Sequence, residues 1–233
     1  MTSRSLALVA LVGAGILALA GCATNTPAPA ASGDGGSATE LEVDAGWLDG
    51  GSMVAVVTYG SSGCVPTATD VALQADGSVA VTLEDPEGDV ACTADYAPRA
   101  SLVALPDGVD AAQGVDLVVT YNDARGDADL DAYAGGDVEE YTPSAGWIND
   151  GMFAILTWGS SSCAPRVQDV SVAGDTATVA FVEPPADQVC TMDMAPRAVL
   201  ATTPDGSDDA TRLTLTGGGA EFANPVTVPI AAS

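Results

Sequence analysis

The chain has 233 residues, with 32 acidic residues against six arginines, no histidine, no lysine and a formal net charge of −26. Such a charge repels the phosphate backbone of nucleic acids and anionic lipid headgroups, so we exclude a nucleic-acid partner. Without histidine or lysine the chain cannot carry a Ser-His-Asp or Ser-Lys site, Schiff-base chemistry or a histidine-ligated metal. Hydrophobic residues make up 47% of the sequence, in alternating runs, so we expect a folded rather than a disordered chain.

The first 21 residues have the features of a secretory signal peptide. One positive charge at Arg4 precedes an apolar run over residues 6–20, which Gly13 interrupts. A membrane-spanning helix needs about 20 apolar residues, which is longer than this run. We therefore interpret residues 1–21 as an export signal that is removed.

The signal ends in Leu19-Ala20-Gly21-Cys22, which resembles the lipobox of bacterial lipoproteins. The resemblance implies that a lipid is attached to the thiol of Cys22 and that cleavage follows just before this residue. Residues 22–44 show no apolar periodicity, so we expect a lipidated flexible tether there. These features predict a protein anchored by its lipid to the extracytoplasmic face of the cell membrane. Plain secretory cleavage near Ala20 is the alternative.

The rest of the chain contains an internal duplication. Four blocks recur in the same order, and they share glycine, tryptophan, cysteine, proline and arginine at matching places. The blocks are Gly46-Trp47-Leu48-Asp49 with Gly146-Trp147-Ile148-Asn149, Thr58 to Pro66 with Thr157 to Pro165, Cys92 to Ala100 with Cys190 to Ala198, and Pro106-Asp107-Gly108 with Pro204-Asp205-Gly206. We therefore predict two tandem homologous modules at residues 45–137 and 138–233.

Apolar patterns predict short β-strands in both modules. Residues 53–59 and 152–158 are continuous apolar runs, which favours strands buried on both faces. Alternation with a period of two over residues 78–84, 115–121 and 212–216 favours half-buried strands, and turn residues separate the runs. The predicted fold is all-β, with each module a small antiparallel β-sandwich of Ig-like outline. No long amphipathic helix is expected after residue 22.

Four cysteines remain besides Cys22, and four cysteines allow three pairings. The duplication favours Cys64–Cys92 and Cys163–Cys190, because a single ancestral module would have carried one complete bridge. Export favours disulfide formation. Metal binding is the weaker alternative, since the chain has neither a Cys-x-x-Cys spacing nor a histidine.

Two repeated blocks have the character of ligand-binding segments. The Gly-Ser-Ser-x-Cys-x-Pro loop offers hydroxyls beside an aromatic residue, or else it is a turn held by the bridge. In the Asp-x-Ala-Pro-Arg block the guanidinium either binds a ligand carboxylate or pairs with the aspartate of its own block or another nearby acid. The candidate binding residues are Tyr59, Ser61, Ser62, Arg99, Trp158, Ser160, Ser161 and Arg197. We expect Trp47 and Trp147 in the core.

One acidic segment, residues 122–131, differs between the modules. Asp127, Asp129 and Asp131 stand at alternate positions and could supply oxygen ligands to calcium. The glycine and the terminal glutamate of an EF-hand are missing, so a solvated strand face is the alternative.

The pattern Trp-Gly-Ser-Ser-Ser-Cys followed by Cys-Thr-x-Asp-x-Ala-Pro-Arg resembles modules of uncharacterised lipoproteins of high-GC Gram-positive bacteria, over about residues 46–216. The resemblance implies an extracytoplasmic location and no particular activity. We expect a non-enzymatic binding or interaction module without a cofactor, whose partner is an envelope protein or a small ligand. A structural or accessory envelope spacer is the alternative, and a carboxylate-based hydrolase is a third.

Overall fold

The structure is a computed structural model that describes residues 39–232. The predicted signal peptide, the predicted lipidation site Cys22 and most of the predicted tether lie outside the described residues. The described chain belongs to one compact unit and consists of fifteen strands and two 3-10 helices of three residues each. The all-β prediction is confirmed.

The first half of the chain forms two sheets. One has the strand order β1-β8-β7-β5-β4 and the other the order β2-β3-β6. The elements are β1 (Thr39–Glu40), β2 (Asp44–Leu48), η1 (Asp49–Gly51), β3 (Met53–Gly60), β4 (Thr67–Leu73), β5 (Val79–Glu84), β6 (Ala97–Ala104), η2 (Ala111–Gln113), β7 (Val115–Tyr121) and β8 (Ala124–Leu130).

The second half forms one sheet of seven strands in the order β11-β12-β14-β15-β9-β10-β13. Its strands are β9 (Ser144–Asn149), β10 (Met152–Gly159), β11 (Val167–Ala173), β12 (Thr176–Phe181), β13 (Ala195–Thr202), β14 (Arg212–Gly217) and β15 (Phe222–Ala231). The long strand β15 joins the two parts of this sheet, because it pairs with β14 along most of its length and with β9 at its end.

The two halves repeat one strand pairing scheme that is not purely antiparallel. β5 pairs with β7 in parallel, and β12 pairs with β14 in parallel. Parallel neighbours need a crossover connection, and here the crossover strands are β6 and β13, which pair with β3 and β10. The expectation of two purely antiparallel, Ig-like sandwiches therefore differs from the structure, which has mixed sheets and a single continuous sheet in the second half.

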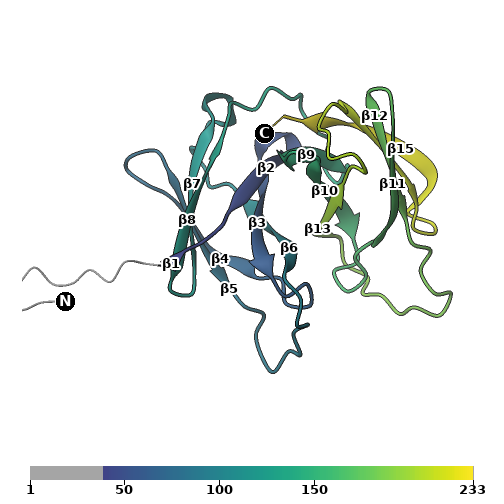
Figure 1. Ribbon diagram of the computed structural model, residues 1–233, viewed down its shortest axis with the longest axis horizontal. Helices are drawn as coiled ribbons and strands as arrows, with labels where there is room; N and C mark the ends of the chain where they lie inside the picture. The colour runs from purple at the N-terminus through teal and green to yellow at the C-terminus, as the bar shows by residue number, and fades with distance from the viewer. Residues whose placement is uncertain (1–38, 233) are drawn as a thin grey trace, which may run out of the picture. The chain divides into compact units, whose positions relative to one another are not determined.

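Three buried apolar clusters hold the unit together. One lies within the first half and contains Trp47, and a second lies within the second half and contains Trp147. The third lies between the halves and combines residues of β2 and β3 with residues of β9 and β10. Figure 1 shows the resulting layers, with β7 and β8 on one side, β11, β12 and β15 on the other, and the remaining central strands between them.

The two continuous apolar runs form the central strands, as predicted. In β3, Val54 and Val56 face the first cluster while Ala55 and Val57 face the cluster between the halves. In β10, alternate residues likewise face the cluster of the second half and the cluster between the halves. Both strands are therefore buried on both faces, which is why they lack the polar alternation of a half-exposed strand.

Glycine allows the two halves to approach each other at β2 and β9. A Cβ atom on Gly46 would lie 2.4 Å from the backbone oxygen of Trp147, and one on Gly146 would lie 2.1 Å from that of Trp47. The contact is reciprocal, as at the interface of a twofold-symmetric dimer. Two hydrogen bonds accompany it, from the Asp49 N–H to Ser144 Oγ (2.9 Å) and from Asn149 Nδ2 to an oxygen of Asp44 (3.3 Å).

Residues 39–44 form part of the fold, although we expected the first module to begin at residue 45. Thr39 and Glu40 form β1, which pairs in parallel with β8, and the Leu41 N–H donates to the Arg125 oxygen at 2.9 Å. Leu41 and Val43 also pack against the first core cluster. Residues 39–44 are thus part of the folded structure.

Candidate functional site

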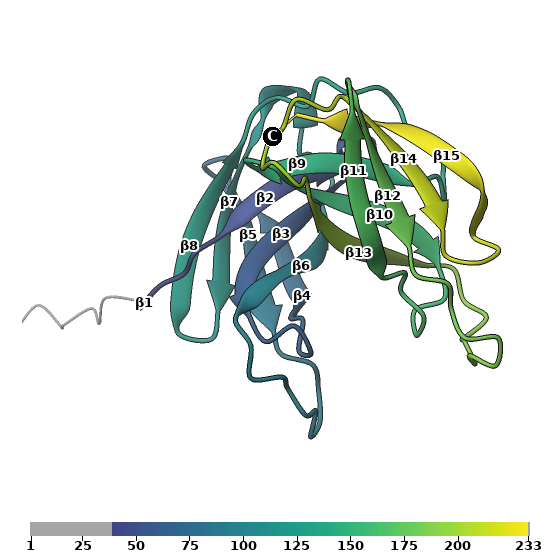
Figure 2. The same ribbon diagram turned by 45° about the vertical axis from the view of Figure 1, so that its right-hand side comes forward.

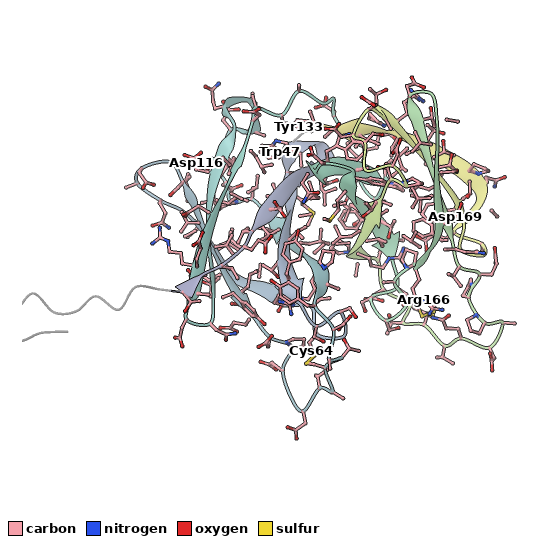
Figure 3. The ribbon with its side chains drawn as sticks, in the orientation of Figure 1. Trp47, Cys64, Asp116, Tyr133, Arg166 and Asp169 are labelled. Atoms are coloured by element: carbon pink, nitrogen blue, oxygen red, sulfur yellow. A yellow bond between two sulfur atoms is a disulfide. The ribbon has the colours of Figure 1, made fainter. Side chains whose placement is uncertain are left out.

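Both predicted disulfides are present, and each connects the loop after a central strand to the loop before the crossover strand. Cys64 bonds to Cys92 with the Cα atoms 5.3 Å apart, and Cys163 bonds to Cys190 with 5.7 Å. Figure 3 shows Cys64 in the lower loops of the first half. In Figures 1 and 2 the two long bridged loops, between β5 and β6 and between β12 and β13, extend from the same side of the molecule.

A hydrogen-bond network joins the serine loop of the first half to the segment after the second cysteine. Asp95 accepts hydrogen bonds from the N–H of Ser62 (3.1 Å) and from the Thr93 hydroxyl. Thr93 Oγ1 also accepts from the Gly63 N–H at 3.0 Å and lies 2.9 Å from Ser61 Oγ. The serine hydroxyls therefore have partners within the loop pair, which supports the interpretation of this loop as a structural turn.

The second half repeats the network with its own residues. Asp193 accepts from the Ser161 N–H (3.1 Å) and from the Thr191 hydroxyl, whose oxygen lies 2.8 Å from Ser160 Oγ. Hydrogen bonds to an ionised carboxylate favour that form. Asp95 accepts hydrogen bonds from the Ser62 side chain, from Thr93 and from the Ser62 backbone, and these bonds lower its pKa to about 2. The equivalent hydrogen bonds lower the pKa of Asp193.

The arginines of the Asp-x-Ala-Pro-Arg block are buried beneath these loops. Arg99 is 5% exposed and donates to the backbone oxygen of Cys64 at 2.8 Å. Arg197 is 6% exposed and donates to the backbone oxygen of Cys163 at 3.0 Å. Because each guanidinium bonds to the carbonyl of a bridged cysteine, each arginine ties its β-strand to the disulfide loop.

The two arginines differ in their acidic partner. Arg197 forms an ion pair with Glu221, which precedes β15. Arg99 has no carboxylate oxygen within 4.0 Å among residues 39–232. Instead, its guanidinium carbon lies 5.5 Å from the centre of the Tyr121 ring. Asp95 and Asp193 bind the serine loops, so the pairing of each arginine with the aspartate of its own block does not form.

A cavity lies beside each arginine. In the first half, a cavity of about 470 Å³ is bounded by the disulfide, Tyr59, Asp85, Arg99 and Tyr121. In the second half, a cavity of about 560 Å³ is bounded by the disulfide, Trp158, Arg166, Arg197 and Glu221. The structure thus brings together most of the predicted candidates of each block. It adds Tyr121 and Glu221, which lie in hairpins that the repeated blocks do not include.

The aromatic candidates Tyr59 and Trp158 occupy equivalent positions at the ends of β3 and β10. The Tyr59 hydroxyl donates to Asp44 at 3.0 Å, and burial together with this carboxylate raises its pKa to about 12. Tyr59 also stacks on Tyr96, with 5.9 Å between the ring centres. The buried Nε1 of Trp158 has no hydrogen-bond partner within the described chain. This donor belongs to a residue that lines the second cavity.

Large apolar side chains are exposed on the bridged loops of both halves. In the first half these are Val90 and Tyr96, the latter 75% exposed. In the second half they are Val189, Met192 and Met194, and Val189 and Met192 are at least 91% exposed. Exposed apolar residues scattered over a surface need no explanation, but a gathering of them on equivalent loops is typical of an interaction surface.

The acidic segment of residues 122–131 forms the end of the β7–β8 hairpin and strand β8. Asp127 and Asp129 are exposed on one face of β8, while Gly126 and Leu130 on its other face are buried. No group of three or more potential metal ligands gathers anywhere in residues 39–232. The predicted calcium ligands Asp127, Asp129 and Asp131 therefore do not gather into such a group.

A further cavity, of about 620 Å³, lies where the segment connecting the halves passes β2 and the end of β15. Trp47 and Tyr133 are in edge-to-face contact at its wall, with ring centres 5.8 Å apart. Trp47 is fully buried, as predicted for a core aromatic, and its Nε1 donates to the Asp131 backbone oxygen at 2.8 Å. The sequence pattern gave no sign of this cavity, because its walls come from distant segments.

Comparison with protein-family models, with curated proteins and with solved structures found no match for this chain. No helix within residues 39–232 is long and apolar enough to cross a membrane.

Proposed function

We propose that this protein is an extracytoplasmic, lipid-anchored binding module that has no enzymatic activity and contacts an envelope protein through its two bridged loops. The proposal combines two features. The lipobox at Cys22 supports the anchor, and the duplicated fold supports two related contact points at residues 45–137 and 138–233. In this interpretation the halves descend from one ancestral β module.

One observation carries the binding function, namely the exposed apolar side chains on equivalent loops of both halves. The disulfide and the Asp95 or Asp193 network hold each loop in place. A loop that is fixed before binding loses less conformational entropy when it binds. Exposed methionines such as Met192 and Met194 are common on surfaces that bind proteins, because the side chain adapts its shape.

The charge of the loops indicates the chemistry of the partner. The loop between β5 and β6 contains Asp85, Glu87, Asp89 and Asp95, and neither this loop nor the one between β12 and β13 contains a basic residue. A partner that accepts the apolar tips therefore carries an apolar recess bordered by lysine or arginine. Binding through both loops at once would raise the overall affinity above that of either loop.

Site-specific photo-crosslinking in the producing cell tests this proposal. We expect a photoreactive residue at position 192 to crosslink to a discrete envelope protein, and one at position 73 to give no such product. Leu73 is the matched control because it is also an exposed apolar residue but lies at the far end of β4 from the bridge.

A second comparison tests whether the loops act through their apolar tips. Replacing Val189, Met192 and Met194 with serine should weaken the crosslink from a photoreactive residue at position 90. The crosslink should disappear only when the first loop is changed as well. An envelope spacer, the alternative function, predicts no discrete crosslink from either loop. Equal crosslinking from positions 192 and 73 would also contradict the proposal.

A further inference from the structure

The duplication places two arginines in the same buried environment, and within residues 39–232 only one of them has a carboxylate partner. Arg99 and Arg197 are each at least 94% buried. A buried guanidinium is unfavourable unless a negative charge and hydrogen bonds compensate for the water it has lost. A difference in partners between two otherwise equivalent arginines therefore needs an explanation.

In the second half, Glu221 supplies the missing charge from within the chain. Its carboxylate binds Arg197 Nη2, which also donates to the backbone oxygen of Trp158 at 3.1 Å. The turn between β14 and β15 makes this contact possible, because four residues separate the paired Gly217 and Phe222. The ion pair shows that the guanidinium has a face open to a carboxylate while it remains bonded to the cysteine loop.

In the first half, the equivalent turn has two residues instead of four, and its one carboxylate, that of Asp123, does not reach Arg99. Only Asn122 and Asp123 separate the paired Tyr121 and Ala124. Tyr121 covers the guanidinium of Arg99 with its ring instead, and its hydroxyl donates to Asp85. Burial and the hydrogen bond to Asp85 raise the pKa of Tyr121, so the phenol stays neutral and does not balance the charge of Arg99.

The hydrogen bonds of Arg99 also leave capacity for a ligand. Within the described chain its Nη2 makes only two hydrogen bonds, at 3.4 Å to Thr58 Oγ1 and at 3.5 Å to the Tyr59 oxygen, and bonds of this length are weak. The buried Nε atoms of Arg99 and Arg197 both lack a partner in the described chain, so the difference between the two arginines lies in their Nη2 groups. The cavity of about 470 Å³ lies beside Arg99 and has the size of a small-molecule pocket.

We propose that this cavity of the first half binds the carboxylate of a small organic acid through Arg99, and that Glu221 is the permanent occupant of the equivalent position in the second half. Tyr59, Val90 and Tyr121 form the apolar part of the cavity wall, so the acid carries an apolar or aromatic group. Asp85 also lines the cavity, and its carboxylate accepts the hydrogen bond of the Tyr121 hydroxyl. The inference does not depend on the protein partner proposed above, because it concerns the cavity beneath the loops and a different kind of ligand.

Calorimetric titration of the full chain with benzoate tests the proposal, with neutral benzamide as the matched control. Physiological salt should be present, because it screens the repulsion between benzoate and distant acidic residues of the protein over a Debye length of about 8 Å. We expect benzoate to bind at one saturable site and benzamide not to bind. Arg99→Gln should weaken the binding roughly tenfold or more.

The variant Glu221→Ala gives a test that does not require any change in the first half. Removing this carboxylate leaves Arg197 without an acidic partner, so we expect a second benzoate site and a stoichiometry of two. Benzoate should also restore part of the melting temperature that this variant loses. Absence of saturable binding to the unaltered chain, equal binding of benzamide, or a stoichiometry of one in Glu221→Ala would overturn the proposal.

A further arm distinguishes a free acid from the end of a peptide chain. A short peptide with a C-terminal phenylalanine carboxylate should bind less tightly than benzoate if the ligand is a free acid, because the cavity has limited room for the rest of the chain. Tighter binding of the peptide, lost on amidation, would overturn the assignment to a small organic acid.

Discussion

Asp95 and Asp193 are exposed carboxylates, yet their hydrogen bonds give them a structural role. Each accepts a backbone N–H from the serine loop and the hydroxyl of a threonine two residues earlier. An ionised carboxylate accepts such bonds better than a protonated one, which is why the pKa of each is lowered.

We expect Asp95→Asn to destabilise the protein near neutral pH and to lose this effect in acid. The folded pKa of Asp95 is about 2, below its ordinary value of 3.8. The stabilisation is therefore fully present above the ordinary value, and it disappears as the pH falls through the folded pKa. Urea unfolding of the variant and of the unaltered protein between about pH 6 and pH 2 measures the difference in their free energies of unfolding.

The control for this prediction is Asp129→Asn, which removes an exposed negative charge from β8 without breaking a loop contact. Its unfolding midpoint should follow that of the unaltered protein at every pH. If the difference in the free energy of unfolding between Asp95→Asn and the unaltered protein stays constant down to pH 2, the role assigned to Asp95 is contradicted.

Residue patterns predicted the disulfide partners but not the partners of the arginines. Cysteine pairing followed from the duplication, since each copy carries two cysteines at matching places. The partner of Arg197 is Glu221, which comes from a hairpin that has no counterpart of equal length in the first half. Repetition carries no information where the two copies differ.

At the scale of elements, the close crossing of β2 and β9 depends on two glycines. Gly46 and Gly146 belong to the first repeated block, and each faces the backbone of the opposite half. Trp47 and Trp147, the next residues along the chain, point into the separate cores of their own halves. The repeated Gly-Trp pair thus serves the contact between the halves and the core within each half.

We expect Gly46→Ala to lower the free energy of unfolding by about 1–3 kcal/mol, the usual cost of overpacking a buried site. The new Cβ would lie 2.4 Å from the Trp147 oxygen, and a backbone atom cannot move aside as the end of a side chain can. Chemical denaturation measures the change. Gly136→Ala is the control, because a Cβ there meets nothing within 4 Å. Equal stability of the two variants would show that the halves separate easily at this crossing.

The strand pairing was only partly predictable from the sequence. Period-two alternation identified β5, β7 and β14, and continuous apolar runs identified β3 and β10. The parallel pairing of β5 with β7 was not expected, because hydrophobic alternation reports which face of a strand is buried and not which strand lies beside it. The short strand β1 carries no such pattern, which is why the sequence alone does not distinguish it from the predicted tether.

At the scale of the whole molecule, the two halves form one unit with a shared buried layer. Leu48 and Val57 of the first half meet Ile148 and Leu156 of the second in the cluster between them. Burial of this layer fixes the two bridged loops relative to each other, which two modules on a flexible connection could not do. Both loops therefore face the same side.

The proposed anchor leads to a prediction for the full chain. Cys22→Ala should remove the thiol that receives the lipid, so we expect the protein to leave the membrane fraction. Cell fractionation with immunodetection measures this, and Cys22 is the residue to change because the other four cysteines are in disulfides. Membrane retention of the variant equal to that of the unaltered protein would refute lipid anchoring.

The amino-acid sequence by itself determined the strand-rich class, the duplication and the cysteine pairs, because each of these appears as a local pattern or as its repetition. The tertiary structure alone decided that the two central strands meet across a shared core, that Glu221 reaches Arg197, and that Arg99 has no acidic partner among the residues that the structure describes. Those outcomes depend on which distant segments become neighbours, and such contacts result from the packing of the whole chain rather than from the residues next to one another.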